Sequence, residues 1–354
     1  MSVGRSERWI PAAAVLLLAI VLATGCAASV KKEKKETVRI GVTLYDQYDT
    51  FISELMNCFS EQVQEKQNSL GVMISLEVMD AAGSQSTQND QVKTLIEKGC
   101  DVICVNLVDR TEPTTITDMA EKAGVPIIFF NRELVAEDLE RWDRLYYVGA
   151  DAFQSGTMQG ELAAAAFQSL KGADKNGDGI CQYVVLEGEP GHQDATVRTE
   201  LSTQALIDQG LELEKLGYAI ANWNRAQAQT KFAQTLTQYK DRIELVLANN
   251  DDMALGAIDA LKAAGISRED WPIIVGIDGT AVGLAAVENK EMYGTIYNDK
   301  EGQAEAMMNL ASALALGESL DDLKIKDGHY IRLDYKTITA VGEASDSGDF
   351  LVTR

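Results

Sequence analysis

Short apolar runs rich in β-branched residues alternate with stretches of helical periodicity along most of this chain. The runs that we predict to be strands cover residues 38–45, 74–80, 102–107, 126–131, 146–149, 183–187, 243–249, 273–277 and 294–297. Amphipathic helices are predicted between them, for example over residues 51–66, 91–98, 195–209, 226–239 and 252–264. Strands that are apolar throughout and alternate with helices form parallel sheets covered on both faces. The residues after 36 suffice for two domains, so we expect an α/β protein with two doubly wound sheets.

The first 25 residues have the features of a secretory signal. Arg5 and Arg8 precede an apolar run over residues 10–23, which is shorter than the roughly 20 apolar residues that a membrane span needs. Cys26 follows small residues and is similar to the acylated cysteine of a bacterial lipobox, so we expect a lipid anchor there and an extracytoplasmic location. Secretion without a lipid is the alternative. Residues 26–36 are predicted to be a tether whose lysines suit an anionic membrane surface.

The charge balance excludes one large class of partner. The chain has 54 acidic and 32 basic residues and a net charge of -22, whereas binding to nucleic acid requires a basic face. The cysteines other than Cys26 show no Cys-x-x-Cys spacing, so we expect unpaired core thiols rather than a disulfide framework. These are Cys58, Cys100, Cys104 and Cys181.

Residues 174–182 have the spacing of a calcium loop. Oxygen ligands stand at every second position, at Asp174, Asn176, Asp178, Ile180 (through its carbonyl) and Gln182. Gly179 permits the sharp turn, but the bidentate glutamate expected at position 12 is replaced by Val185, so another carboxylate must complete the site. A solvated Asp/Asn/Gly turn between a helix and a strand is the alternative.

A second loop follows the strand over residues 183–187. It contains two glycines and a proline, and then His192, Asp194 and Arg198, of which the last two stand four residues apart on one predicted helix face. An imidazole, a carboxylate and a guanidinium supply the acceptors and donors that sugar hydroxyls need. The alternative is a helix-capping aspartate with an ordinary i,i+4 ion pair.

Other residues of the same kind follow further strands. In parallel sheets ligands bind at the carboxyl ends of the strands, so these residues are expected to lie close together. Carboxylates and amides can bind the rim of a pyranose while aromatic rings cover its faces. The alternative is that the Asp and Asn residues only cap the next helix. The residues concerned are Asp49, Phe51, Asn106, Trp223, Asn250, Asp278 and Asn298.

Several segments in unbroken order between residues 38 and 335 resemble the galactose/glucose-binding proteins of bacterial ABC sugar uptake. They include Gly-Val-Thr-Leu-Tyr, Asn-Leu-Val-Asp, Val-Pro-Ile-Ile-Phe-Phe-Asn-Arg-Glu, Gly-Glu-Pro-Gly-His, Leu-Ala-Asn-Asn-Asp-Asp-Met-Ala-Leu-Gly-Ala and Ile-Tyr-Asn-Asp. The resemblance implies a type I periplasmic-binding-protein fold, in which two similar Rossmann-like lobes are joined by a three-strand hinge and enclose one sugar. It implies a first lobe of residues 37–127 and 299–332, and a second of residues 128–298 and 333–354.

The resemblance also implies roles for single residues. Phe51 and Trp223 match the stacking pair of the family, and Glu244 matches the distant carboxylate of its Ca²⁺ site. The positions that match its hydroxyl-binding residues are Asp49, Asn106, His192, Asp194, Arg198, Asn250, Asp278 and Asn298. Two positions depart from the family pattern. Gln193 stands where the family often has proline, and Thr50 replaces a polar neighbour of Phe51. The implied protein is a monomeric galactose or glucose binder that delivers its ligand to an ABC permease and is not an enzyme.

Three other functions stay open from the sequence. A chemoreceptor or other signalling receptor could take the closed form in place of a permease. A ribose- or xylose-type binder would have the same fold. A glycoside hydrolase would use a pair of carboxyl groups, one of them with a raised pKa, whereas we expect Arg198 to keep Asp194 ionised.

Overall fold

The computed structural model describes residues 1–2 and 35–340, and the chain divides into residues 1–36 and 37–354. Residues 3–34, which contain most of the predicted signal peptide, Cys26 and most of the tether, lie outside the described residues, as do residues 341–354. None of the described helices is long and apolar enough to cross a membrane.

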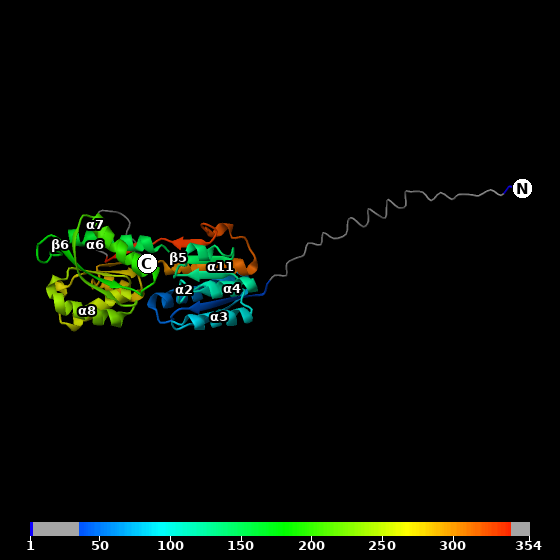
Figure 1. The fold of residues 1–354 in the computed structure, drawn as a ribbon, viewed down its shortest axis with the longest axis horizontal. Helices are drawn as coiled ribbons and strands as arrows, with labels where there is room; N and C mark the ends of the chain where they lie inside the picture. Colours follow the sequence, from blue (N-terminus) through cyan, green and yellow to red (C-terminus); the bar gives the residue numbers. More distant parts are fainter. Residues whose placement is uncertain (3–34, 341–354) are drawn as a thin grey trace. The chain divides into compact units, whose positions relative to one another are not determined.

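Residues 37–340 form two six-stranded sheets, each with helices on both faces (Figure 1). The first sheet has the strand order β11-β5-β4-β3-β1-β2 and is parallel throughout. Its elements are β1 (Thr37–Leu44), α2 (Thr50–Leu70), β2 (Met73–Asp80), α3 (Gln85–Glu97), β3 (Val102–Val105), α4 (Thr114–Ala123), β4 (Ile127–Phe130), α5 (Ala136–Leu139), β5 (Leu145–Ala150), α11 (Lys300–Leu316), η3 (Asp321–Leu323) and β11 (Tyr330–Leu333).

The second sheet has the order β12-β10-β9-β8-β6-β7, and only its β10–β12 pair is antiparallel. Its elements are α6 (Ala152–Ser169), β6 (Ile180–Glu187), α7 (Gln193–Asp208), β7 (Glu212–Ile220), α8 (Arg225–Tyr239), η1 (Lys240–Arg242), β8 (Leu245–Ala248), α9 (Asp251–Ala263), η2 (Arg268–Asp270), β9 (Ile273–Asp278), α10 (Ala281–Glu288), β10 (Gly294–Tyr297) and β12 (Lys336–Thr339). The predicted α/β class with two doubly wound lobes is confirmed.

Each sheet is buried on both sides because its central strands are apolar at every position. All four residues of β3, β4 and β8 are buried. In the first lobe one core cluster joins α2 and α11 to one face of the sheet, and a second joins α3 and α4 to the other. In the second lobe α6 and α7 cover one face and α8 and α9 the other (Figure 1). Burial of apolar area at about 25 cal/mol per Å² is therefore the main force holding each lobe together.

Within residues 35–340 the chain passes between the two sheets three times, after β5, after β10 and after β11. The first passage corrects the boundary that we expected between residues 127 and 128. Strand β4 pairs in parallel with β3, and β5 with β4, so residues 127–150 complete the first sheet and belong to the first lobe.

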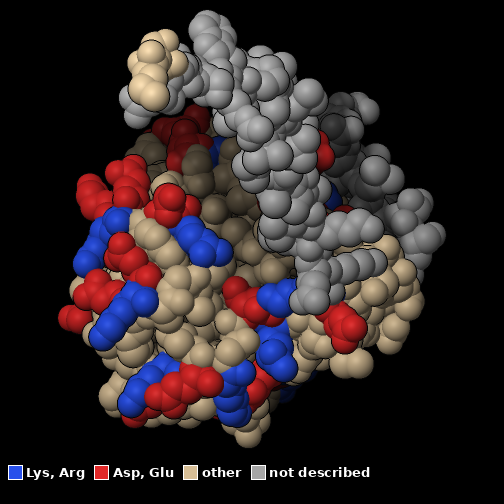
Figure 2. Space-filling model, turned by 90° about the vertical axis from the view of Figure 1, so that its right-hand side faces the viewer, with Lys and Arg blue, Asp and Glu red and all other residues tan. Residues whose placement is uncertain are grey.

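The cysteines are unpaired in the described part of the chain, as expected, and Cys100, Cys104 and Cys181 are buried while Cys58 is partly exposed. On the face of the molecule in Figure 2, Lys and Arg side chains are interspersed with Asp and Glu. This face is therefore not a basic patch, and the net charge of -22 disfavours polyanionic partners.

Candidate functional site

Most of the predicted sugar-binding residues line one polar cavity. The first lobe contributes Tyr45, Asp49, Phe51, Asn131 and Arg132, and the second contributes His192, Asp194, Arg198, Trp223, Asn250 and Asp278. Each follows the carboxyl end of a strand or stands in the first turns of the next helix. The cavity therefore lies where ligands bind in parallel α/β sheets, and both lobes build it.

Asn106 and Asn298 are the two predicted sugar ligands that the structure does not place in the cavity lining. Asn106 is fully buried, and its side-chain nitrogen donates to the Phe130 carbonyl at 3.1 Å and to Asn131 Oδ1 at 3.2 Å. Asn298 is 3% exposed, and its side-chain oxygen accepts from Gln303 at 2.6 Å. Asn106 thus supports a lining residue, and Asn298 supports the start of α11.

Three lining residues were missing from the predicted set. Tyr45 follows β1, and Asn131 and Arg132 follow β4, so the strand-end rule that found the other residues also applies to these. The Tyr45 hydroxyl donates to Asp49 Oδ2 at 2.6 Å, and the Arg132 guanidinium lies 3.7 Å from the centre of the Tyr45 ring. Tyr45 therefore positions a carboxylate and a guanidinium of the same lobe.

Three lining residues also cap helices, as the capping alternative expected for Asp49 and Asn250, but the cap of α7 is His192 and not the expected aspartate. Asp49 Oδ1 accepts from the Ile52 amide at 2.9 Å, His192 Nδ1 from the Asp194 amide at 3.1 Å and Asn250 Oδ1 from the Met253 amide at 2.9 Å. The amino termini of α2, α7 and α9 thereby point at the cavity, where their positive ends favour carboxylates and polar ligand oxygens.

Arg198 organises the carboxylates of the second lobe. It is 3% exposed, and it donates to the Asn249 carbonyl at 2.9 Å and the Tyr335 hydroxyl at 3.1 Å. Its guanidinium also lies 3.1 Å from Asp194 Oδ2 and 3.9 Å from Asp278 Oδ1. These contacts fix the planar fork, so that both carboxylates can turn their remaining lone pairs to a ligand.

Arg198 favours the ionised form of Asp194, as the sequence predicts, but burial of the carboxyl acts in the opposite sense and is the larger effect. Burial raises the pKa of Asp194 above its usual value, and Arg198 only opposes this shift. Burial also raises the pKa of Asp278 well above its usual value. Desolvation outweighs the ion pair because both carboxyl groups are almost completely buried within the cavity lining, at 9% and 6% exposure.

His192 is held as a neutral imidazole. Burial lowers its pKa well below the usual value, and Arg132, Arg198 and Arg110 lower it further. Because Nδ1 accepts a hydrogen bond from the Asp194 amide, the ring proton belongs on Nε2. The ring also lies edge-on to Trp223, with centroids 5.1 Å apart and an interplanar angle of 74°.

The backbone is strained at three lining residues. Asn131, Trp223 and Asp278 have φ values of 62°, 60° and 115°, a region that residues other than glycine seldom adopt. Gly188 gives the indole its place, because a Cβ there would lie 2.2 Å from the Trp223 ring. Such strain persists only where the surroundings enforce it, and here it sets the direction of side chains around the cavity.

The predicted calcium ligands form a compact loop at the start of β6. Asp174 accepts from the amides of Gly177 and Gly179 at 2.7 and 2.9 Å, while Glu244 accepts from the amides of Lys175 and Gln182 at 2.6 and 3.0 Å. Asn176 and Gln182 donate to Asp178 at 2.8 and 3.0 Å. Glu244 therefore lies next to the loop, although residues 182 and 244 are remote in sequence.

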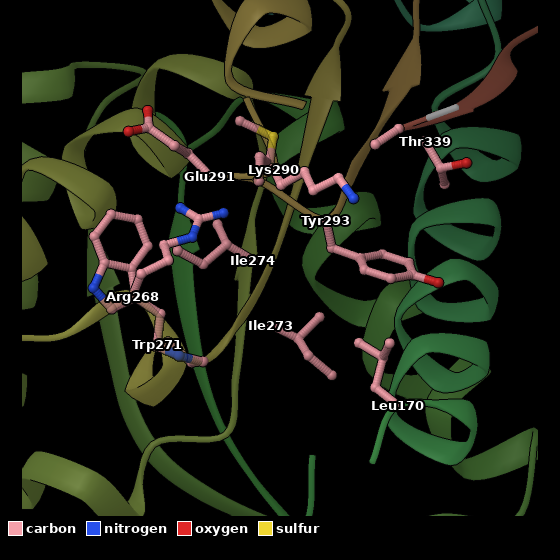
Figure 3. A pocket seen from close by; sticks show the side chains of 12 residues that line it. Leu170, Arg268, Trp271, Ile273, Ile274, Lys290, Glu291, Tyr293 and Thr339 are labelled. Atoms are coloured by element: carbon pink, nitrogen blue, oxygen red, sulfur yellow. The ribbon is translucent and has the colours of Figure 1, made fainter. Parts of the chain in front are cut away.

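A second pocket lies at the opposite end of β9 (Figure 3). It is lined by residues that precede or start β9 and β10, including Trp271, Ile273 and Tyr293, and by Thr339 at the end of β12. None of the predicted sugar-binding or calcium-binding residues lines this pocket. Its position at the amino ends of β9 and β10 separates it from the polar cavity.

Comparisons with known proteins agree on one family. Residues 40–319 match the model of the periplasmic binding protein domain. The D-galactose/methyl-galactoside binding periplasmic protein of Haemophilus influenzae is 36% identical over 318 residues, which are 88% of this chain and 92% of that protein. A xylitol-binding protein of Mycolicibacterium smegmatis is 31% identical over 304 residues, 84% of this chain and 78% of that protein. The structure of an ABC transporter solute binding protein from Bacillus halodurans with bound myo-inositol has a TM-score of 0.72 at 27% identity, and covers 87% of this chain and 96% of that one.

Proposed function

Since this chain belongs to the periplasmic binding protein family, whose members bind substrates for ABC transporters and are not enzymes, we propose that its ligand is D-galactose or D-glucose. The chain is an extracytoplasmic sugar-binding component of an ABC transporter. The finer choice of ligand is supported by the relative that binds D-galactose and by the donors and acceptors of the cavity.

The combination of side chains in the cavity carries the proposal. Asp49, Asp194 and Asp278 offer acceptors, Arg198 and the His192 Nε2 proton offer donors, and Asn250 offers both. A pyranose presents hydroxyls that both donate and accept around its rim, and apolar C–H groups on its faces. Phe51 from the first lobe and Trp223 from the second supply the apolar surfaces.

Closure follows from the division of the site between the lobes. A ligand held by one lobe alone would leave hydroxyls without partners, so the sugar favours the state in which both lobes contact it. Hinge closure around a ligand is established for periplasmic binding proteins in general.

Calorimetric titration with galactose, glucose, ribose and xylose tests the ligand. We expect galactose or glucose to bind most tightly, and Asp278→Ala to weaken binding about five- to a hundredfold, because a ligand hydroxyl loses its buried partner at ~1–3 kcal/mol. Asp118→Ala, which removes an exposed pair with Arg141, is the control and should bind like the parent. Tighter binding of ribose or xylose would overturn the proposal.

We also propose that Asp174, Asn176, Asp178, Gln182 and Glu244, with the Ile180 carbonyl, bind one structural Ca²⁺. Within residues 35–340 no cluster of three or more His, Cys, Asp and Glu side chains forms a metal site by itself, so amide and carbonyl oxygens must complete the shell. The donor set fits a hard cation, which prefers six to eight oxygens. Burial raises the pKa of Glu244, and the charges of Asp174 and Asp178 raise it further, so a cation would relieve this repulsion.

Thermal melting tests the calcium proposal. At a Ca²⁺ concentration a hundred times the Kd, binding to the folded state adds about 2.7 kcal/mol of stability, so a chelator should lower the melting midpoint. Glu244→Gln should reduce that difference, because the buried carboxylate is lost. An equal midpoint with Ca²⁺ and with chelator would count against the site.

A further inference from the structure

Two arginines of the first lobe bond the loop of the second lobe that carries His192 and Asp194. Arg132 Nη2 donates to Glu189 Oε2 at 2.6 Å, and Arg110 Nη2 donates to Gln193 Oε1 at 3.0 Å. Glu189 and Gln193 thus bracket His192, at the point where α7 begins. These two bonds connect the lobes directly, in addition to any contact that a ligand makes with both.

The first lobe holds both arginines by itself. Arg132 is 4% exposed, lies on the Tyr45 ring and donates to the Val108 carbonyl at 2.8 Å. Arg110 donates through Nε to the Glu133 carbonyl at 2.6 Å. All of these partners belong to the first lobe, so these contacts of the two guanidinium groups do not require the second lobe.

The side chains of the second lobe that accept these two bonds are partly exposed to solvent. The Glu189 side chain is 42% exposed even when paired, so water solvates it readily once the lobes separate. Gln193 is likewise partly exposed. The two bonds therefore stabilise the closed state and cost little to lose in the open state.

We propose that Arg110 and Arg132 are positioning residues that deliver the loop of His192 and Asp194 to the sugar by bonding Gln193 and Glu189 on closure. The inference rests on the proposed function and deepens it. The apparent Kd equals the intrinsic Kd divided by the fraction of molecules in the competent state, so these bonds set affinity through the closed fraction. Gln193 matters here because its side-chain oxygen is the acceptor for Arg110.

The test combines sugar affinity with the shape of the sugar-free protein. Glu189→Gln replaces a charge-assisted hydrogen bond by a neutral one, a difference of ~1 kcal/mol, so galactose or glucose should bind about fivefold more weakly. Gln193→Ala should act in the same direction, and the double variant more strongly. The dissociation rate should account for most of the change, because the bonds form after encounter.

Small-angle X-ray scattering without sugar supplies the second readout. Each variant should have a larger radius of gyration than the parent, because more molecules are open. Salt should weaken binding less in Glu189→Gln than in the parent, since the partly exposed ion pair is screened. The control is Glu214→Gln, which removes the exposed ion pair with Arg242 inside the second lobe and should match the parent.

The outcomes separate the two proposals. If the parent binds none of the four sugars, the proposed ligand is wrong, while scattering still decides whether the bonds favour closure. If Glu189→Gln and Gln193→Ala melt like the parent and match it in both affinity and radius of gyration, the positioning role is overturned.

Discussion

The surroundings of His192 determine both that its ring is neutral and which ring nitrogen carries the proton. Its Nδ1 accepts from a backbone amide, and three arginines add positive charge near a ring that is already desolvated. Protonation would break the hydrogen bond and bury a cation near three arginines, which the Asp194 carboxylate, 3.8 Å from Nδ1, only partly offsets. Both the cap of α7 and the cavity therefore require the neutral ring.

This arrangement predicts an acid-side loss of stability. A histidine with a folded pKa below its unfolded value of about 6.5 adds stability that is complete above pH 6.5 and is lost as the pH falls toward the folded pKa. Unfolding titrations of the parent and His192→Gln should therefore differ most between pH 7 and 8, and converge on acidification. NMR should show the His192 ring neutral well below pH 6.5, with His329→Gln used to assign the two histidines of the chain. A ring that titrates near pH 6.5 would contradict the interpretation.

Sequence reasoning selected residues of the cavity lining where a residue type and a strand end coincide, and it failed to select them where the contact depends on the tertiary structure. Asp194 and Asp278 were selected correctly for the cavity, but Asn106 has the same sequence context and lies beneath the lining instead. Asn131 and Arg132 follow β4 in the same way and were passed over. The rise in the pKa of Asp194 could not be predicted, because the sequence shows the neighbouring arginine but not the degree of burial.

At the scale of elements, strand existence was easier to predict than strand order. The apolar central strands were predicted, whereas β11 and β12 are four residues long and lack a continuous apolar run. Edge strand β7 (Glu212–Ile220) is absent from the predicted strands, because its first four residues, Glu-Leu-Glu-Lys, are mostly charged, as edge strands commonly are. The lobe boundary was misplaced because local pattern does not say which sheet a strand joins.

Alanine substitution of two glycines of the second lobe should affect different properties, sugar affinity in one case and stability in the other. A Cβ at Gly188 would meet the Trp223 indole at 2.2 Å, so Gly188→Ala should displace the stacking ring and weaken sugar binding about tenfold while stability changes little. A Cβ at Gly256 would lie 2.4 Å from the Arg225 carbonyl and 2.7 Å from Ala228 Cβ, where α8 packs on α9. Gly256→Ala should therefore cost ~1–3 kcal/mol of unfolding free energy without changing the intrinsic affinity. Calorimetric titration and urea unfolding of both variants separate the two effects, and equal losses in both assays would refute the assignment of Gly188.

The whole molecule depends on two lobes with separate cores and a shared cavity. Each sheet carries its own apolar clusters on both faces, so each lobe contains the interactions that fold it. Within residues 35–340, three chain passages and polar contacts such as Thr50 Oγ1 to Asp252 at 2.6 Å connect the lobes. A sugar that contacts both lobes therefore couples two otherwise independent stabilities.

Scanning calorimetry should show this coupling. Without sugar the lobes can melt in separate steps, and at a hundred times the Kd the sugar adds about 2.7 kcal/mol to the state in which both lobes are folded. We expect the transitions to move up and to merge, because unfolding of either lobe releases the ligand. Asp49→Ala changes a residue of the first lobe alone. At a fixed sugar concentration it should nevertheless reduce the sugar-induced rise in the melting temperature of both lobes, because the affinity of the whole site falls. If the sugar raised the melting of the second lobe only, in the parent and in Asp49→Ala alike, the first lobe would have no part in binding and the shared cavity would not be the ligand site.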